Sequence, residues 1–225
     1  MAARFTYAEM SIQHAASKSK KLLNRLNITP TFWAICEVAL QSSSYISIHR
    51  IFNKDSKYNI YALLDSMEQN LIIFQREALS GRKCEILTNP ADLNNYLSNT
   101  YFPTVKDVTR LRKLVSKYNI IYDRAVRPVR NKYLAHRVAT QVESQALYAT
   151  GKIREFWRLT TFLLKLNNVL WKQYHNGEKP IFRPMRYSVK SIFDASYQST
   201  EPHESIVSDV KKLMQFIESA SFCKP

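Results

Sequence analysis

The chain has 225 residues and a formal net charge of +15 at pH 7, from 33 lysines and arginines against 18 aspartates and glutamates. Only three residues are glycine, which excludes glycine-rich nucleotide-binding loops and disfavours β-sandwiches and barrels. Three widely separated cysteines predict neither a disulfide framework nor a metal site. No apolar stretch reaches the ~18 residues of a membrane span. We therefore expect a reduced, cytoplasmic protein without a membrane partner, whose charge favours a polyanion such as nucleic acid.

Apolar residues recur at helical spacing through most of the first hundred residues. Thr29 is the predicted N-cap of the second helix, and Pro30 suits its first position. Gly81 is the predicted end of the fourth helix. The expected helices span 6–26, 30–52, 59–67, 69–80 and 91–98.

The second half of the chain also predicts helices. Thr104 and Asp107 resemble a capping box at the start of a strong helix, which Pro128 should disturb near residue 127. Gly177 is the predicted end of the most clearly amphipathic helix. The expected helices begin at Thr104, cover 152–175 and cover about 202–219. Because helix follows helix, the chain reads as an all-α bundle.

The charge is concentrated in one segment. Between Thr104 and Arg137, ten cations and two anions give a local net charge of +8. Such a run is often only a solvated helical face. This one, however, encloses Arg130 and His136. Histidine exchanges protons near neutral pH, and arginine binds phosphate oxygens through two parallel hydrogen bonds. Metal-free RNA cleavage needs a base, an acid and a fixed cation, so this pair suits that chemistry.

The spacing of Arg130 and His136 leaves two arrangements open. Six residues at ~100° each place the two side chains about 120° apart on an ideal helix. Either the helix breaks between them, or a second copy of the chain completes the site across a two-fold interface.

The run from Arg130 to His136 resembles the R-x(4–6)-H signature of the HEPN superfamily, including the polar Asn131 after its arginine. The phrase Tyr133-Leu134-Ala135-His136 is similar to the abortive-infection, AbiU2-like branch. A second similar stretch is Phe32-Trp33 followed by Ile48 to Asp55. Two positions depart from family patterns. Asn53 stands where the branch often has aspartate, and Val138 stands where another branch has tyrosine.

The resemblance implies an up-and-down HEPN-type bundle over 1–177 that forms a homodimer. Residues 178–225 fall outside the resemblance, and we expect them to form an irregular segment and a C-terminal helix packed on the bundle. The resemblance also implies a metal-independent endoribonuclease without a cofactor, acting as a toxin or antiviral effector, with RNA and an antitoxin protein as partners. Arg130 would stabilise the phosphate, His136 would act as general acid or base, and Asn131 would orient the substrate.

Other residues are candidates for supporting roles. Arg50, His49 and Tyr133 could support the site, although packing is the simpler role for each. The predicted RNA-binding cations are Arg124, Arg127, Lys132 and Arg137. Two alternatives stay open: a non-catalytic HEPN-fold module that binds RNA, nucleotide or protein, and an interaction protein whose basic face meets an acidic partner.

Overall fold

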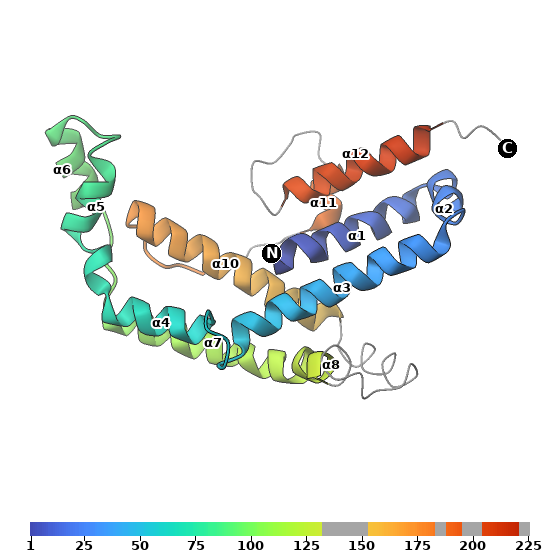
Figure 1. Ribbon diagram of the computed structural model, residues 1–225. Coiled ribbons are helices and arrows are strands. Elements are labelled where there is room, and N and C mark those ends of the chain that lie inside the picture. The colour runs from blue at the N-terminus through green and yellow to red at the C-terminus, as the bar shows by residue number, and fades with distance from the viewer. Residues whose placement is uncertain (132–152, 183–187, 195–203, 221–225) are drawn as a thin grey trace. The chain divides into compact units, whose positions relative to one another are not determined.

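The computed structural model describes residues 1–131, 153–182, 188–194 and 204–220. The described residues form helices joined by short connections, with no strand among them (Figure 1), so the predicted all-α class is confirmed. The chain divides into two compact units. The terminal unit comprises Met1–Ile48 and Arg186–Pro225, and the central unit comprises His49–Met185. The predicted division at residue 177 stays a prediction.

The terminal unit is built around α1, which packs against α2, α11 and α12. In Figure 1, α12 runs alongside α1. Together α1, α2 and α12 bury a small apolar core that comprises Ala8, Ala15, Leu22, Leu26, Val210 and Met214. The bounds of these helices are α1 (Ala2–Lys18), α2 (Lys20–Leu26), α11 (Val189–Asp194) and α12 (Ser205–Ser219).

The expectation of one helix over 6–26 was wrong. Ser19 has extended backbone angles and separates α1 from α2. Its hydroxyl accepts a hydrogen bond of 3.1 Å from the backbone N–H of Leu22. Serine favours this N-cap role because its side chain satisfies an N–H group that the first helical turn leaves free. The next helix, α3 (Pro30–Phe52), has the predicted bounds and continues from the terminal unit into the central unit.

The central unit is organised along α7, which packs against α4 and α10. Buried Leu111 and Val115 lie on α7, and Tyr118 of α7 stacks on Phe162 of α10 at 3.9 Å between ring centroids. Figure 1 shows α5 and α6 at one end of α7 and α8 at the other. The bounds are α4 (Ile60–Gln69), η1 (Leu71–Phe74), α5 (Arg76–Lys83), α6 (Pro90–Ser98), α7 (Val105–Ala125), α8 (Arg127–Val129) and α10 (Ile153–Asn176).

Local capping chemistry explains several of these boundaries. The carboxylate of Asp107 accepts a 2.9 Å hydrogen bond from the backbone N–H of Thr104, which confirms the predicted capping box. Gly177 follows α10 with φ of +62°, a conformation that favours glycine at a helix end. Gly81, by contrast, lies inside α5, so the prediction that it ends a helix was wrong. None of the described helices combines the length and apolarity needed to cross a bilayer.

Candidate active site

A short turn after α7 presents Arg130. The helix α7 ends at Ala125, and Pro128 lies in the first turn of α8, so the predicted disturbance near residue 127 is confirmed. The side chains of Val126 and Val129 are almost completely buried. The backbone N–H of Arg130 donates a 3.0 Å hydrogen bond to the carbonyl of Val126. Two buried valines and this hydrogen bond therefore fix the backbone from which Arg130 projects.

Arg130 and Asn131 contact each other directly. A terminal nitrogen of the Arg130 guanidinium donates a 3.0 Å hydrogen bond to Oδ1 of Asn131, and both residues are half-buried. Among the described residues, Arg130 has no carboxylate partner. A guanidinium carries five N–H groups. One neutral amide uses few of them, so most of the donors of Arg130 stay available for a phosphate.

His49 lies in the last turn of α3 and is bonded to Tyr122 of α7. The Tyr122 hydroxyl and Nδ1 of His49 are 2.7 Å apart. Both side chains are buried, and the ring of Phe52 stacks on Tyr122 at 5.2 Å and 12°. His49 was a predicted supporting residue. Tyr122 was not singled out, because in the sequence it is one more member of the apolar face of its helix.

The electrostatics connect His49 to Arg130. Burial lowers the pKa of His49, and the positive charges of Arg130 and Arg127 lower it further, while Asp55 acts in the opposite direction. Burial is also the main cause that raises the pKa of Tyr122 above its ordinary value. Neutral histidine and neutral tyrosine are therefore the favoured forms beside two arginines. The hydrogen bond between His49 and Tyr122 joins the end of α3 to α7. From Tyr122, backbone hydrogen bonds of 2.9 Å to Val126 and then 3.0 Å to Arg130 place Arg130 two turns further along the same side of the chain.

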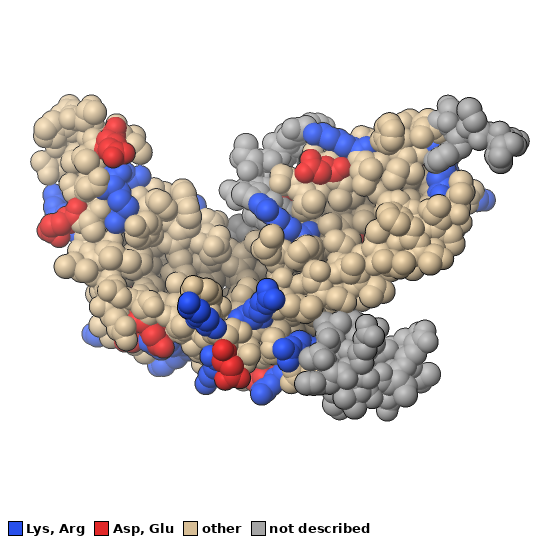
Figure 2. Space-filling view, in the orientation of Figure 1, with Lys and Arg blue, Asp and Glu red and all other residues tan. Residues whose placement is uncertain are grey.

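Most other arginines of the +8 segment are engaged by carboxylates. Figure 2 shows that acidic side chains accompany the basic ones on the face of the central unit near α7 and α8. An ion-paired arginine is partly neutralised and is a weaker attractor of phosphate than Arg130. The pairs are Arg110 with Asp107, Arg112 with Asp65 and Glu68, Arg124 with Glu155, and Arg127 with Asp123.

The structure places only part of the predicted site. Arg50 is exposed and makes no hydrogen bond or ion pair with the residues that the structure describes. Among those residues, no group of three or more histidine, cysteine, aspartate or glutamate side chains could hold a metal ion. Four predicted site residues lie outside the described part of the chain: Lys132, Tyr133, His136 and Arg137.

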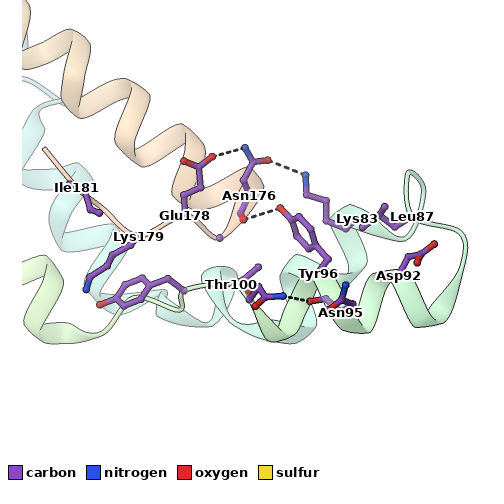
Figure 3. Close-up of a pocket in the computed structure, with 13 residues that line it drawn as sticks. Lys83, Leu87, Asp92, Asn95, Tyr96, Thr100, Asn176, Glu178, Lys179 and Ile181 are labelled. Carbon is purple, nitrogen blue, oxygen red and sulfur yellow. Dashed lines mark hydrogen bonds between the residues drawn. The ribbon is translucent and has the colours of Figure 1, made fainter. Parts of the chain in front are cut away.

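A separate pocket of about 1110 Å³ lies at the other end of α7, between α6 and the end of α10 (Figure 3). Lys83 donates a 3.0 Å hydrogen bond to the side-chain oxygen of Asn176, whose amide donates to Glu178. The lysines of the lining, Lys83 and Lys179, are matched by Asp92 and Glu178. This pocket therefore lacks the excess of positive charge that a phosphate site needs.

In a comparison with protein families, the model of the HEPN family described as AbiU2 matches residues 1–197. Because this match covers most of the 225 residues, the chain belongs to the AbiU2 family of HEPN proteins. Neither the curated proteins nor the solved structures provide a match.

Proposed function

We propose that this AbiU2-family HEPN protein is a metal-independent endoribonuclease and that it acts in the cell as a toxin or antiviral effector. The observation that carries the proposal is the environment of the Arg130 side chain. It is fixed by a buried turn, contacts Asn131, and has no carboxylate partner among the described residues. It stands six positions before His136, the residue that we propose as proton carrier.

The proposed reaction is an internal transesterification of RNA. The ribose 2′-oxygen attacks the adjacent phosphorus and gives up its proton to a base, while the bond from phosphorus to the 5′-oxygen breaks. An acid protonates the leaving 5′-oxygen, so the products carry a 2′,3′-cyclic phosphate and a 5′-hydroxyl. His136 acts as acid or base, Arg130 stabilises the charge on the phosphoryl oxygens, and Asn131 orients the arginine.

We also propose that two copies of the chain meet at this site. On an ideal helix, Arg130 and His136 of the same chain would point about 120° apart, so the two side chains would not reach one phosphate together. A two-fold axis brings a second copy of each residue to the same place. Arg127, which is well exposed, would contact the RNA backbone beside Arg130.

The main test is cleavage of an end-labelled RNA in the presence of EDTA. We expect wild-type protein to release a 2′,3′-cyclic phosphate and a 5′-hydroxyl. His136→Ala and Arg130→Ala should each lose at least about 100-fold in rate. His175→Ala, on α10 and outside the motif, is the matched histidine control and should cleave normally. Unchanged cleavage by His136→Ala contradicts the proposal. Salt-sensitive RNA binding without products supports the non-catalytic module instead.

A second experiment tests the assembly. Arg130→Ala and His136→Ala chains are co-expressed with different tags, and the mixed dimer is isolated. If Arg130 of one copy works with His136 of the other, the mixed dimer retains one intact site and recovers cleavage. If both residues act within one copy, the mixed dimer stays inactive. A wild-type protein that cleaves as a monomer, shown by light scattering at assay concentration, overturns the two-copy arrangement.

A further inference from the structure

The buried pair of His49 and Tyr122 adds a specific group to the proposed site. His49 is 7% exposed, and Nδ1 is held at 2.7 Å by the Tyr122 hydroxyl. The two residues lie on different helices and 73 positions apart in the chain. The ring of Phe52 stacks on the ring of Tyr122 and leaves it little freedom to turn. The imidazole ring of His49 is therefore fixed in orientation.

The hydrogen bond also selects the tautomer of His49. The Tyr122 hydroxyl has Nδ1 of His49 as its hydrogen-bond partner among the described residues. If Nδ1 of His49 carried a hydrogen, it could not accept a hydrogen bond from the Tyr122 hydroxyl. The buried hydroxyl hydrogen of Tyr122 would then have no acceptor among the described residues, and an unsatisfied buried donor costs free energy. The hydroxyl therefore donates to Nδ1. In a neutral imidazole the other nitrogen, Nε2, then carries the hydrogen and acts as a donor.

The charges around His49 favour this neutral form. The positive charges of Arg127, on α8, and of Arg130, the residue after α8, both disfavour a third positive charge on His49. Asp55, in the connection after α3, acts in the opposite direction, and the Tyr122 hydroxyl contacts His49 from α7. Burial disfavours the imidazolium as well. His49 is consequently suited to donate a hydrogen bond and is unsuited to release a proton as an acid.

We infer that Nε2–H of His49 is a neutral hydrogen-bond donor to a non-bridging oxygen of the phosphate that Arg130 holds, with Tyr122 as the residue that positions it. This inference rests on the proposed function for the identity of the phosphate as RNA. A neutral donor adds direction to the binding of the phosphoryl oxygens, whereas the arginines supply the charge. It leaves the proton transfers to His136.

The tautomer and the anion contact are tested without cleavage, by ¹⁵N NMR of histidine-labelled protein with inorganic phosphate as the probe. At pH 7 we expect Nδ1 of His49 to be unprotonated and Nε2 to be protonated. Phosphate should shift the Nε2–H resonance of wild-type protein, and Arg130→Ala should remove that shift. Tyr122→Phe should give a mixture of tautomers. A protonated Nδ1, or a resonance that phosphate leaves unmoved, overturns the inference.

The activity test uses two amides that imitate different nitrogens of the ring. The amide nitrogen of His49→Gln reaches the position of Nε2, whereas His49→Asn reaches only the position of Nδ1. We expect His49→Gln to stay within about tenfold of wild type in kcat and His49→Asn to lose about 100-fold, with KM little changed. Circular dichroism and thermal melting check that both variants fold. If both lose activity equally, the inference fails.

The two proposals fail in different ways. A phosphate-dependent shift at His49 in a protein that cleaves no RNA keeps the anion contact and rejects the ribonuclease. RNA cleavage that is lost in His136→Ala but unaffected by either His49 substitution keeps the ribonuclease and rejects the role of His49.

Discussion

Glu9 on α1 and Glu37 on α3 hold two carboxylates close together within the terminal unit. Burial raises the pKa of Glu9, and the negative charge of Glu37 raises it further, to about 7. Gln41 opposes this by donating a 3.3 Å hydrogen bond to Glu9, and Gln13 donates one of 2.6 Å to Glu37. Glu9 therefore changes charge near neutral pH.

This raised pKa predicts a pH-dependent stability. A carboxyl group that holds its proton more tightly when folded lowers the free energy of unfolding as the pH rises from 4.5 to about 7. The loss is complete above pH 7 and absent below pH 4.5. Glu9→Gln removes it, so we expect the variant to be more stable than wild type by about 1 kcal/mol at pH 8 and equal at pH 4.5, since partial exposure screens the charge. Urea denaturation at both pH values measures this.

The matched control for Glu9 is Glu85→Gln, in the exposed turn after α5. Its effect on the free energy of unfolding should be the same at pH 4.5 and pH 8. A Glu9→Gln variant that behaves like this control at both pH values would show that the carboxylates do not interact in solution.

Gly177 and Gly81 predict opposite effects of the same substitution. At Gly177, φ is +62°, and an added Cβ would lie 2.8 Å from Cδ2 of Leu79 and 2.9 Å from Cβ of Thr100. Gly177→Ala should therefore destabilise the protein by about 2 kcal/mol or more. Gly81 is inside α5, and apart from its chain neighbours and the backbone of its own helix no atom lies within 4 Å of the new Cβ. Gly81→Ala should stabilise by about 0.5–1 kcal/mol. Thermal melts of both variants test this, and equal signs would refute it.

Asp107 combines a helix cap with a tertiary contact. Its carboxylate accepts hydrogen bonds of 2.6 Å from the Tyr101 hydroxyl and 2.9 Å from the backbone of Thr104. Burial alone would raise the pKa of Asp107, but the hydrogen bonds from Tyr101 and Thr104 and the charge of Arg110 together hold it below its ordinary value. This stabilisation is present above about pH 4 and is lost as the pH falls through the lowered pKa.

We therefore expect Asp107→Asn to lower the free energy of unfolding by about 1–2 kcal/mol at pH 7 and by less near pH 3, since the wild-type carboxylate is then becoming protonated. Asp92→Asn, exposed in the first turn of α6, is the control and should cost less than about 0.5 kcal/mol. The measurement is denaturant unfolding over this pH range. A deficit of Asp107→Asn that stays constant down to pH 3 would contradict the lowered pKa.

Local chemistry explains which parts of the fold were predictable from sequence. Pro30, the Thr104–Asp107 cap and Gly177 each act within one helical turn, so their effect can be read without knowing the tertiary fold. The prediction that a helix ends at Gly81 failed because a glycine inside a short helix cannot be distinguished in the sequence from a glycine that ends one. The short helix α11 was missed because six residues carry too little periodicity to stand out.

The candidate site was predictable only in part. The pairing of Arg130 with Asn131 follows from adjacent residues. The partner of His49 could not be inferred, because Tyr122 lies 73 residues away and fits the apolar pattern of α7 equally well. Likewise, the net charge of residues 104–137 can be counted from the sequence. Which of their arginines form ion pairs with carboxylates on other helices can be seen only in the folded structure. Arg112 meets Asp65 and Glu68 only because α4 packs on α7.

This difference between arginines predicts different salt dependences of RNA binding. Arg130 has no carboxylate partner among the described residues, whereas Arg112 donates hydrogen bonds of 2.5 Å to both Asp65 and Glu68. A cation that releases counterions on binding a phosphate contributes about 0.7 to the slope of log K against log salt for single strands. We expect Arg130→Gln to reduce the slope by about that amount, as measured by fluorescence anisotropy with a labelled, uncleavable 2′-O-methyl RNA.

Arg112→Gln, on α7, is the matched arginine variant within the same +8 segment. Because its guanidinium joins α7 to α4, the substitution should leave the slope unchanged and lower the free energy of unfolding by up to about 1 kcal/mol. Equal reductions of the slope by both variants would mean that RNA binding depends on the total charge of the segment and not on a contact with one arginine. A reduction confined to Arg130→Gln would mean that a phosphate is bound at the one described arginine of the segment that has no carboxylate partner, where the proposed chemistry requires it.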